Sequence, residues 1–307
     1  MKFITGNTNK NKKILILNDF YRPHGWVNSS LIMLVDKLKN YPIHTIIYGD
    51  PSTKLSIEEW TKVQSEDTPI PDFLEKELQT HDGVIGIELP KFIINKLNEI
   101  NIPYINYHHS PYRFCGINPK IWSIETGLEI SNSFIPKLTP NRLISDNTYE
   151  VGTLIIGQTK YDRVLIKNNK FLSVKDFEEE IENLPPPHYF CPHQDGDIEL
   201  IEWAKEKGYE LSDRPTYEML DLNPKIVCGV NSSVLYEARD VWHLPVRFFN
   251  ELHEYKNNIQ LPESIAFDHD FIDSVLDANV KEAEKIISNK FLNLFDIITK
   301  AKILKAF

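Results

Sequence analysis

The chain has 307 residues, of which 41% are hydrophobic and 11% aromatic, enough apolar material for more than one packed core. Its formal net charge of −10 argues against a general nucleic-acid-binding protein, because contacts to phosphate need a basic face. Cys115, Cys191 and Cys228 form no CxxC pair, which argues against a disulfide framework and against a zinc ribbon.

The first apolar run of the chain is short. It follows several lysines and ends at Asn18 and Asp19, so it does not have the length of a signal-peptide core. No stretch approaches the roughly 18 apolar residues that a membrane-spanning helix needs. We therefore expect a cytoplasmic protein whose membrane association, if it has one, is peripheral.

In the first half, short β-branched runs alternate with stretches of helical periodicity, a pattern typical of a parallel sheet covered on both faces. The predicted strands are 13–18, 43–48, 83–87 and 102–107. The predicted helices are 29–38, 71–78 and 90–100.

The periodicity fades over residues 131–150, which are rich in Ser, Pro, Asn and Thr and which we interpret as a connection. The same α/β pattern then returns. The predicted strands are 151–156, 189–192, 225–230 and 245–248, and the predicted helices are 174–182, 197–207, 215–220 and 232–239, with helix again over 268–307.

These elements predict an α/β fold with two doubly wound Rossmann-like domains facing across a cleft. The expected domains are 1–150 and 151–285, followed by a C-terminal helix over 286–307. In open α/β sheets, ligands bind at the carboxyl ends of the strands, so the site is expected there.

Familiar nucleotide motifs are absent. There is no GxGxxG after the first predicted strand and no GxxxxGK[ST], which argues against a dinucleotide dehydrogenase and a P-loop enzyme. Two acidic triplets, Asp195-Gly-Asp197 and Asp268-His-Asp270, could bind a metal ion that in turn holds a diphosphate. With 44 acidic residues such triplets arise by chance, so we favour loop and helix-cap carboxylates.

Three predicted strand ends in the second half carry polar groups suited to an anionic ligand. They are GQTKYD at 157–162, CPHQ at 191–194 and NSS at 231–233, the last opening a helix. Their order and spacing resemble the β-Kdo transferases of bacterial capsule and O-antigen assembly, whose hallmarks are GQVE-x-D, KPHP and a Ser-rich turn before GFEAL. The resemblance covers about residues 151–250 and includes LPV at 244–246.

The resemblance implies a GT-B-like glycosyltransferase that moves Kdo, or a related acidic keto-sugar, from a CMP-sugar to a surface-polysaccharide or lipid-linked acceptor without a metal. It implies retention through an aspartyl-sugar intermediate, with Asp162 as nucleophile. A turn-capping Asp162 is the alternative. Lys160 stands where the family has glutamate, which puts in doubt the sugar contact at that position or membership of the typical subgroup.

The residues themselves indicate which groups would bind the donor phosphate. Negative charge on the departing phosphate needs preorganised donors, which a helix N-terminus with Asn231 as its cap would provide. Glu237 could accept ribose hydroxyls, or it could be an exposed helical carboxylate paired with Arg239 or Arg163. The expected donor-binding residues are Gln158, Lys160, His193, Asn231, Ser232, Ser233 and Glu237, with His193 also assisting departure of the phosphate.

Acceptor-side candidates lie in the first half, where residues 86–114 loosely resemble the acceptor segment of the same family. Glu88 follows a predicted strand and is a candidate general base, with a helix cap as the alternative. His108, His109 and Arg113 close the next predicted strand and are acceptor-side candidates, with histidines bonded to backbone as the alternative. The donor carboxylate could pair with Lys160, Arg163 or Arg113.

Two other functions stay open: a sialyltransferase-like CMP-nonulosonate transferase, and a non-catalytic sugar-nucleotide-binding protein of an assembly complex. The last apolar run carries Lys290, Lys300, Lys302 and Lys305. It could touch an anionic inner membrane or an assembly partner, or pack back onto the first domain.

Overall fold

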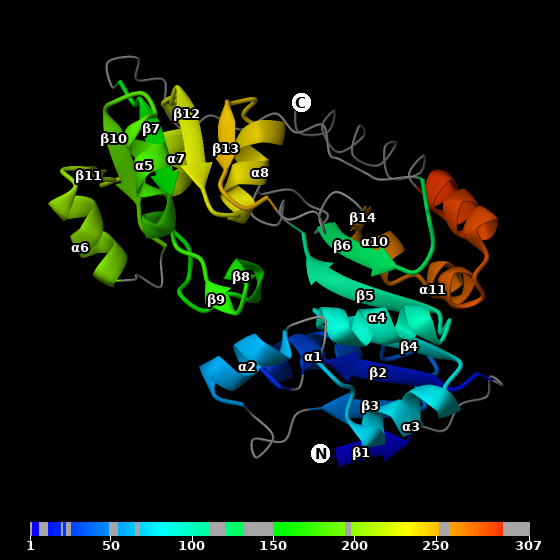
Figure 1. The fold of residues 1–307 in the computed structure, drawn as a ribbon. Helices are drawn as coiled ribbons and strands as arrows, with labels where there is room; N and C mark the ends of the chain where they lie inside the picture. The colour runs from blue at the N-terminus through cyan, green and yellow to red at the C-terminus, as the bar shows by residue number, and fades with distance from the viewer. Residues whose placement is uncertain are drawn as a thin grey trace. The chain divides into compact units, whose positions relative to one another are not determined.

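The computed structural model describes residues 2–5, 12–19, 21–22, 26–48, 55–64, 68–110, 121–131, 150–193, 198–251 and 258–290 (Figure 1). These residues fall into two compact units. The first unit holds the described residues up to His109 together with 121–131 and 258–290, and the second holds 150–251. Both units are α/β with largely parallel sheets, as the sequence predicts.

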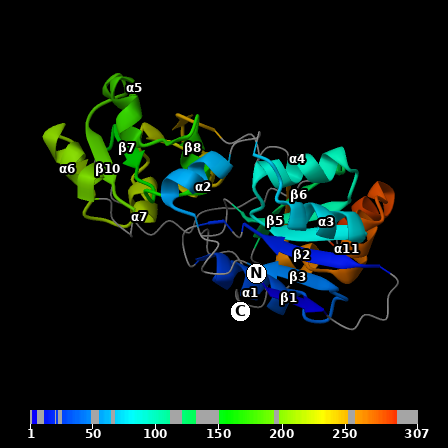
Figure 2. The same ribbon diagram turned by 60° about the horizontal axis from the view of Figure 1, so that its bottom comes forward.

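The sheet of the first unit has seven strands in the order β1-β3-β2-β4-β5-β6-β14. The four at its centre, β3, β2, β4 and β5, are parallel, and β1, β6 and β14 add to it in antiparallel fashion. The strand bounds are β1 Lys2–Thr5, β2 Ile14–Asn18, β3 Thr45–Tyr48, β4 Gly83–Ile87, β5 Tyr104–His109, β6 Ile121–Thr126 and β14 Ile259–Pro262. Figure 2 shows β1, β3 and β2 side by side.

Helices cover both faces of this sheet, which is why β2 and β4 are buried along their whole length. The helices are α1 Trp26–Lys37, α2 Ile57–Val63, α3 Asp72–Thr80, α4 Lys91–Glu99, α10 Glu263–Ala266, α11 His269–Leu276 and a last helix over 280–290. One core contains α1, α11 and the last helix, and the other contains α3 and α4.

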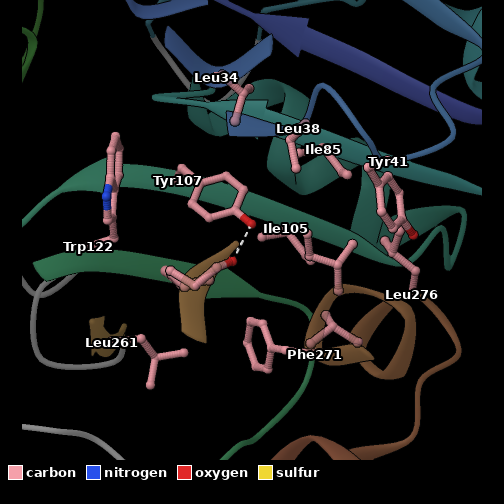
Figure 3. Packing of buried hydrophobic residues seen from close by; sticks show 14 of the residues in the cluster. Leu34, Leu38, Tyr41, Ile85, Ile105, Tyr107, Trp122, Leu261, Phe271 and Leu276 are labelled. Atoms are coloured by element: carbon pink, nitrogen blue, oxygen red, sulfur yellow. Dashed lines mark hydrogen bonds between the residues drawn. The ribbon is translucent and has the colours of Figure 1, made fainter. Parts of the chain in front are cut away.

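Figure 3 shows the first of these cores. The ring of Tyr107 lies among aliphatic side chains and beside Trp122, and its hydroxyl donates a hydrogen bond of 2.7 Å to the carbonyl of Ala266. Leu261 of β14 and Phe271 of α11 belong to the same core. The segment after residue 257 therefore completes the first unit.

This packing corrects the predicted boundary at residue 285. β14 pairs with β6, from Ile259 opposite Ile124 to Pro262 opposite Ile121, so residues 258–290 belong to the first unit. Of the predicted C-terminal helix 286–307, residues up to 290 are helical and the remainder lies outside the described residues. Ile287, which precedes the lysine-bearing run 289–307, is buried in the core of the first unit, and the packing of that run onto the first unit stays a prediction.

The second unit is a five-stranded parallel sheet in the order β11-β10-β7-β12-β13. The strand bounds are β7 Thr153–Ile156, β10 His188–Cys191, β11 Glu210–Leu211, β12 Ile226–Gly229 and β13 Val246–Phe248. Counted from the first strand of the unit, this is the doubly wound order 3-2-1-4-5. The winding reverses between β7 and β12, and that switch point is where such sheets bind ligands.

Two helices pack on each face of this sheet, and Figure 1 shows β10, β7, β12 and β13 side by side. The helices are α5 Glu178–Glu182, α6 Ile198–Glu206, α7 Thr216–Asp221 and α8 Ser233–Asp240. The predicted helix 174–182 is a 3₁₀ turn, Val174–Phe177, that continues into α5. A hairpin of β8 Ile166–Lys167 and β9 Lys170–Phe171 follows a 3₁₀ helix, Arg163–Leu165. None of the described helices has the length and apolarity needed to cross a bilayer.

Candidate functional site

The three motif loops emerge side by side at the carboxyl edge of the second sheet. β7 is paired on one side with β10 and on the other with β12, and the strand ends are in register, with Cys191 opposite Ile156 and Cys228 opposite Ile155. The loops that begin at Gly157, Pro192 and Val230 therefore leave neighbouring strands. In the structure Gln158 and Asn231, which are 73 residues apart in the sequence, are in contact.

Gln158 and Asn231 join two of these loops across the switch point. The Nε2 of Gln158 donates to the Oδ1 of Asn231 at 2.7 Å, and the backbone N–H of Asn231 donates to the Oε1 of Gln158 at 3.0 Å. The Nδ2 of Asn231 donates to the carbonyl of Val164 at 2.5 Å. Asn231 is 2% exposed, so its amide is fully engaged in holding the loops together.

The prediction that Asn231 caps α8 is therefore wrong. The cap is Ser232, whose hydroxyl accepts a hydrogen bond of 3.4 Å from the N–H of Val234. Ser232 and Ser233 are partly exposed, and the first turn of α8 contains no acidic residue. The positive end of the helix dipole thus lies at this edge with no carboxylate in the first turn of α8.

Gly157 brings the third loop close. A Cβ at this position would stand 3.1 Å from both the carbonyl oxygen of Cys191 and the backbone nitrogen of His193. The N–H of Gly157 donates to the same carbonyl at 2.9 Å. A larger residue here would have to displace these backbone atoms slightly, and the close approach places the partly exposed His193 next to the loop after β7.

Glu237 does not match the alternative of an exposed helical carboxylate. It is fully buried, and the hydroxyl of Tyr217 on α7 donates to its Oε2 at 2.7 Å. Arg239 instead pairs with Asp240 at 2.8 Å and with Glu251 at 3.3 Å. Glu237 is therefore not an exposed helical carboxylate, and its contact with ribose stays a prediction.

Asp162 begins the 3₁₀ helix after the first motif. Its Oδ1 accepts a hydrogen bond of 3.3 Å from the N–H of Val164, which is the capping geometry of the alternative interpretation. The carboxylate is partly exposed, and this is its one hydrogen bond to described residues. The cap occupies one oxygen, so the geometry also allows attack by the other.

Lys160 pairs with Glu199 of α6 at 3.1 Å, and both side chains are largely exposed. They stand over a cavity of about 290 Å³ on the face of the sheet that α6 covers. Apart from this pair, the lining residues are Gln158, Thr159, Tyr161, Leu165, Phe171, Leu172, Ser173, Val174, Lys175, Leu200 and Val230.

The sequence analysis assigns no element to 166–173, which supplies three of these lining residues, Phe171, Leu172 and Ser173. The signal was present as Asn168-Asn169, which have φ of 50° and 60° and form the turn between β8 and β9. Two asparagines with positive φ are typical of a two-residue hairpin. The surrounding strands have two residues each, too few to show alternation.

In the first unit, Glu88 ends β4 in a left-handed conformation, with φ of 50°. Its carboxylate accepts a hydrogen bond of 2.6 Å from Arg22, so it is an ion-pair partner and not a helix cap. Asp19, at the end of the neighbouring strand β2, accepts the indole N–H of Trp60 at 3.0 Å. Both strand ends are thus occupied by polar contacts within the unit.

His108 and His109 point to opposite faces of β5. The Nε2 of His108 lies 3.2 Å from the carboxylate of Glu125 and 2.9 Å from the amide of Asn106. The ring of His109 stacks on Trp122 with centroids 5.5 Å apart. His108 therefore bonds to side chains, whereas the alternative interpretation expects a bond to backbone.

Several expected site residues cannot be placed. Arg113, Gln194, Asp195 and Asp197 lie outside the described residues. Asp268 of the second acidic triplet caps α11 by accepting from the N–H of Phe271 at 3.2 Å, and it also contacts Lys290. Across the described ranges, no group of three or more His, Cys, Asp or Glu side chains is arranged to hold a metal ion.

The two described cysteines are both buried in the second unit. Burial raises the pKa of Cys228 to about 12 and also raises the pKa of Cys191 above its usual value. Nucleophilic chemistry by cysteine needs a thiolate. Neither side chain is therefore suited to it.

One solved structure similar to this chain is KpsC of Thermosulfurimonas dismutans, a β-Kdo 2,7 transferase. The sequence identity is 10% and the TM-score 0.43, and the alignment covers 87% of this chain and 99% of that chain. No protein-family model matches the sequence, and no curated protein matches it significantly. A sequence identity of 10% and a TM-score of 0.43 are too low to assign a function to this chain.

Proposed function

We propose that the chain is a glycosyltransferase that binds a CMP-activated acidic sugar, Kdo or a related keto-sugar, at the carboxyl edge of the second unit. One observation carries this proposal: the loops that resemble the β-Kdo transferase motifs meet at the switch point of a doubly wound sheet, where Gln158 and Asn231 hydrogen-bond to one another.

The phosphate of the donor is assigned to the N-terminus of α8. The amides and hydroxyls of Ser232 and Ser233 offer hydrogen bonds that strengthen as the C–O bond to the phosphate breaks and negative charge develops. His193, on the neighbouring loop, is the assigned donor that neutralises this charge. No metal is needed in this scheme.

Asp162 is assigned to the anomeric carbon. Its carboxylate would form the C–O bond to the sugar as the bond to CMP breaks, and the acceptor hydroxyl would then displace it, which retains the configuration. The acceptor, an oligosaccharide or glycolipid, is assigned to the first unit. Glu88 would take the acceptor proton, for which its ion pair with Arg22 has to open.

Calorimetric titration of the full chain with CMP, UMP and AMP tests the binding part of the proposal. We expect CMP to bind in preference to the other two, and CMP to be released from CMP-Kdo when acceptor is present. Binding without any release across an acceptor panel would favour a non-catalytic sugar-nucleotide-binding protein. An α-linked sialoside as product would favour the sialyltransferase-like alternative.

Variants of the phosphate site test its residues. His193→Ala, and the pair Ser232→Ala and Ser233→Ala, should each lower transfer at least about tenfold through lost stabilisation of the phosphate. Lys225→Ala is the control, because Lys225 pairs with Glu150 just before β12, at the opposite end of the strand. Activity unchanged in both site variants would remove these loops from the donor site.

A further inference from the structure

The cavity beside the first motif contains one cation without an anion. Lys160, Lys175 and Glu199 are its charged lining residues, and Lys160 and Glu199 neutralise each other at 3.1 Å. Lys175 is partly buried, and within the described part of the chain its ammonium makes no ion pair. The described lining residues therefore carry an excess of one positive charge.

Lys175 is held in place by its local structure. Ser173 caps the 3₁₀ turn Val174–Phe177, accepting from the N–H of Lys175 at 3.3 Å, and its own N–H donates to Asp176 at 2.6 Å. In this capping box the carboxylate of Asp176 accepts a hydrogen bond from the backbone of the turn. The base of the Lys175 side chain is thereby fixed at the wall of the cavity.

The size of the cavity restricts its occupant. A cavity of about 290 Å³ lies at the lower end of the range for small-molecule sites, about 300–1,000 Å³, and has room for one ring of a sugar nucleotide. The expected phosphate ligands His193, Ser232 and Ser233 are not among its lining residues, and Asp162 follows the lining residue Tyr161 without lining the cavity itself. Since Asp162 is assigned to the anomeric carbon, the sugar ring is the part of the donor that would lie beside it.

We infer that this cavity binds the sugar of the donor and that Lys175 binds the sugar's carboxylate, which makes Lys175 a specificity-determining residue for acidic keto-sugars. The inference rests on the proposed function. Tyr161 and Phe171, whose rings meet edge to face with centroids 5.5 Å apart, form an apolar wall for the ring. A neutral sugar would leave the partly buried ammonium unpaired, and this penalty selects for the acid.

The test compares two ligands by calorimetry on the full chain: CMP, and a non-hydrolysable phosphonate analogue of CMP-Kdo. Lys175→Met removes the charge and keeps the length of the side chain. We expect it to weaken the analogue about tenfold, the usual effect of losing one charge-assisted hydrogen bond, and to leave CMP binding unchanged. The methyl ester of the analogue has no carboxylate to pair with the ammonium, so it should lose no affinity in the variant and should bind it at least as tightly as wild type. Lys205→Met, on the exposed face of α6 outside the cavity, is the control and should change nothing.

Two results would overturn the inference alone. Unchanged affinity of the Lys175→Met variant for the analogue would show that the ammonium does not contact the sugar. An equal loss for CMP and the analogue would place the ammonium at the phosphate. Wild-type protein that binds neither ligand would overturn the proposed function and the inference with it.

Discussion

At the scale of single residues, Asp162 has the most specific assignment. Replacement by Asn keeps an oxygen that can accept from Val164, so the cap and the fold should survive. The nucleophilic charge is lost, so transfer should fall at least about a hundredfold while CMP still binds. Mass spectrometry of wild type mixed with CMP-Kdo should show a sugar adduct on the peptide that contains Asp162.

The matched control is Asp213→Asn, which changes an exposed aspartate of the same unit outside the motif loops. It should leave both transfer and adduct formation at the wild-type level. Retained transfer with β-linked product in the Asp162→Asn enzyme would contradict the covalent mechanism and leave Asp162 as a turn residue.

The sequence predicts where polar residues leave the strands, but not what each one contacts. Asn is common at helix caps, which favours Asn231 as the cap of α8, yet its buried side-chain amide bonds to Gln158 and Val164, and its backbone N–H also bonds to Gln158. For Glu237 the sequence leaves an exposed helical carboxylate as the alternative to a ribose ligand, whereas the side chain is buried and the hydroxyl of Tyr217 compensates its burial. Both differences come from contacts distant in sequence, which local preferences do not contain.

At the scale of elements, the close packing of β7 against β10 controls the shape of the site. Gly157→Ala would place a methyl group 3.1 Å from two backbone atoms of the β10 loop, so the two loops must move apart. We expect a loss of about 1–3 kcal/mol in the free energy of unfolding and weaker CMP binding. Denaturant unfolding and calorimetry measure the two effects.

The Gly208→Ala variant is a control that should lower the stability of the protein without changing the shape of the site. Gly208 has a φ of 73° and open space around its Cβ position, so alanine costs backbone strain, about 1 kcal/mol, without touching the motif loops. It should lower stability and leave CMP affinity unchanged. CMP affinity preserved in Gly157→Ala would show that the contact between the loops is irrelevant to the ligand.

The buried parallel strands were predictable because they are nearly continuous apolar runs, such as ILILN in β2. The antiparallel strands β6 and β14 were not. Ser123 and Glu125 interrupt the apolar run of β6, and Gln260 interrupts that of β14. These polar side chains are accommodated in the sheet by hydrogen bonds, Gln260 to Ser123 and Asn106 to Glu125. With β14 missed, the end of the second domain was also misplaced.

In the full chain, the donor is proposed to bind at the carboxyl edge of the second sheet. Hydrogen–deuterium exchange of the full chain with and without CMP locates the bound nucleotide. Bound CMP should slow exchange in peptides that cover residues 157–163 and 230–236, because those amides would be ordered or bonded by the ligand. Slowed exchange confined to the first unit, or no change at saturating CMP, would contradict the account.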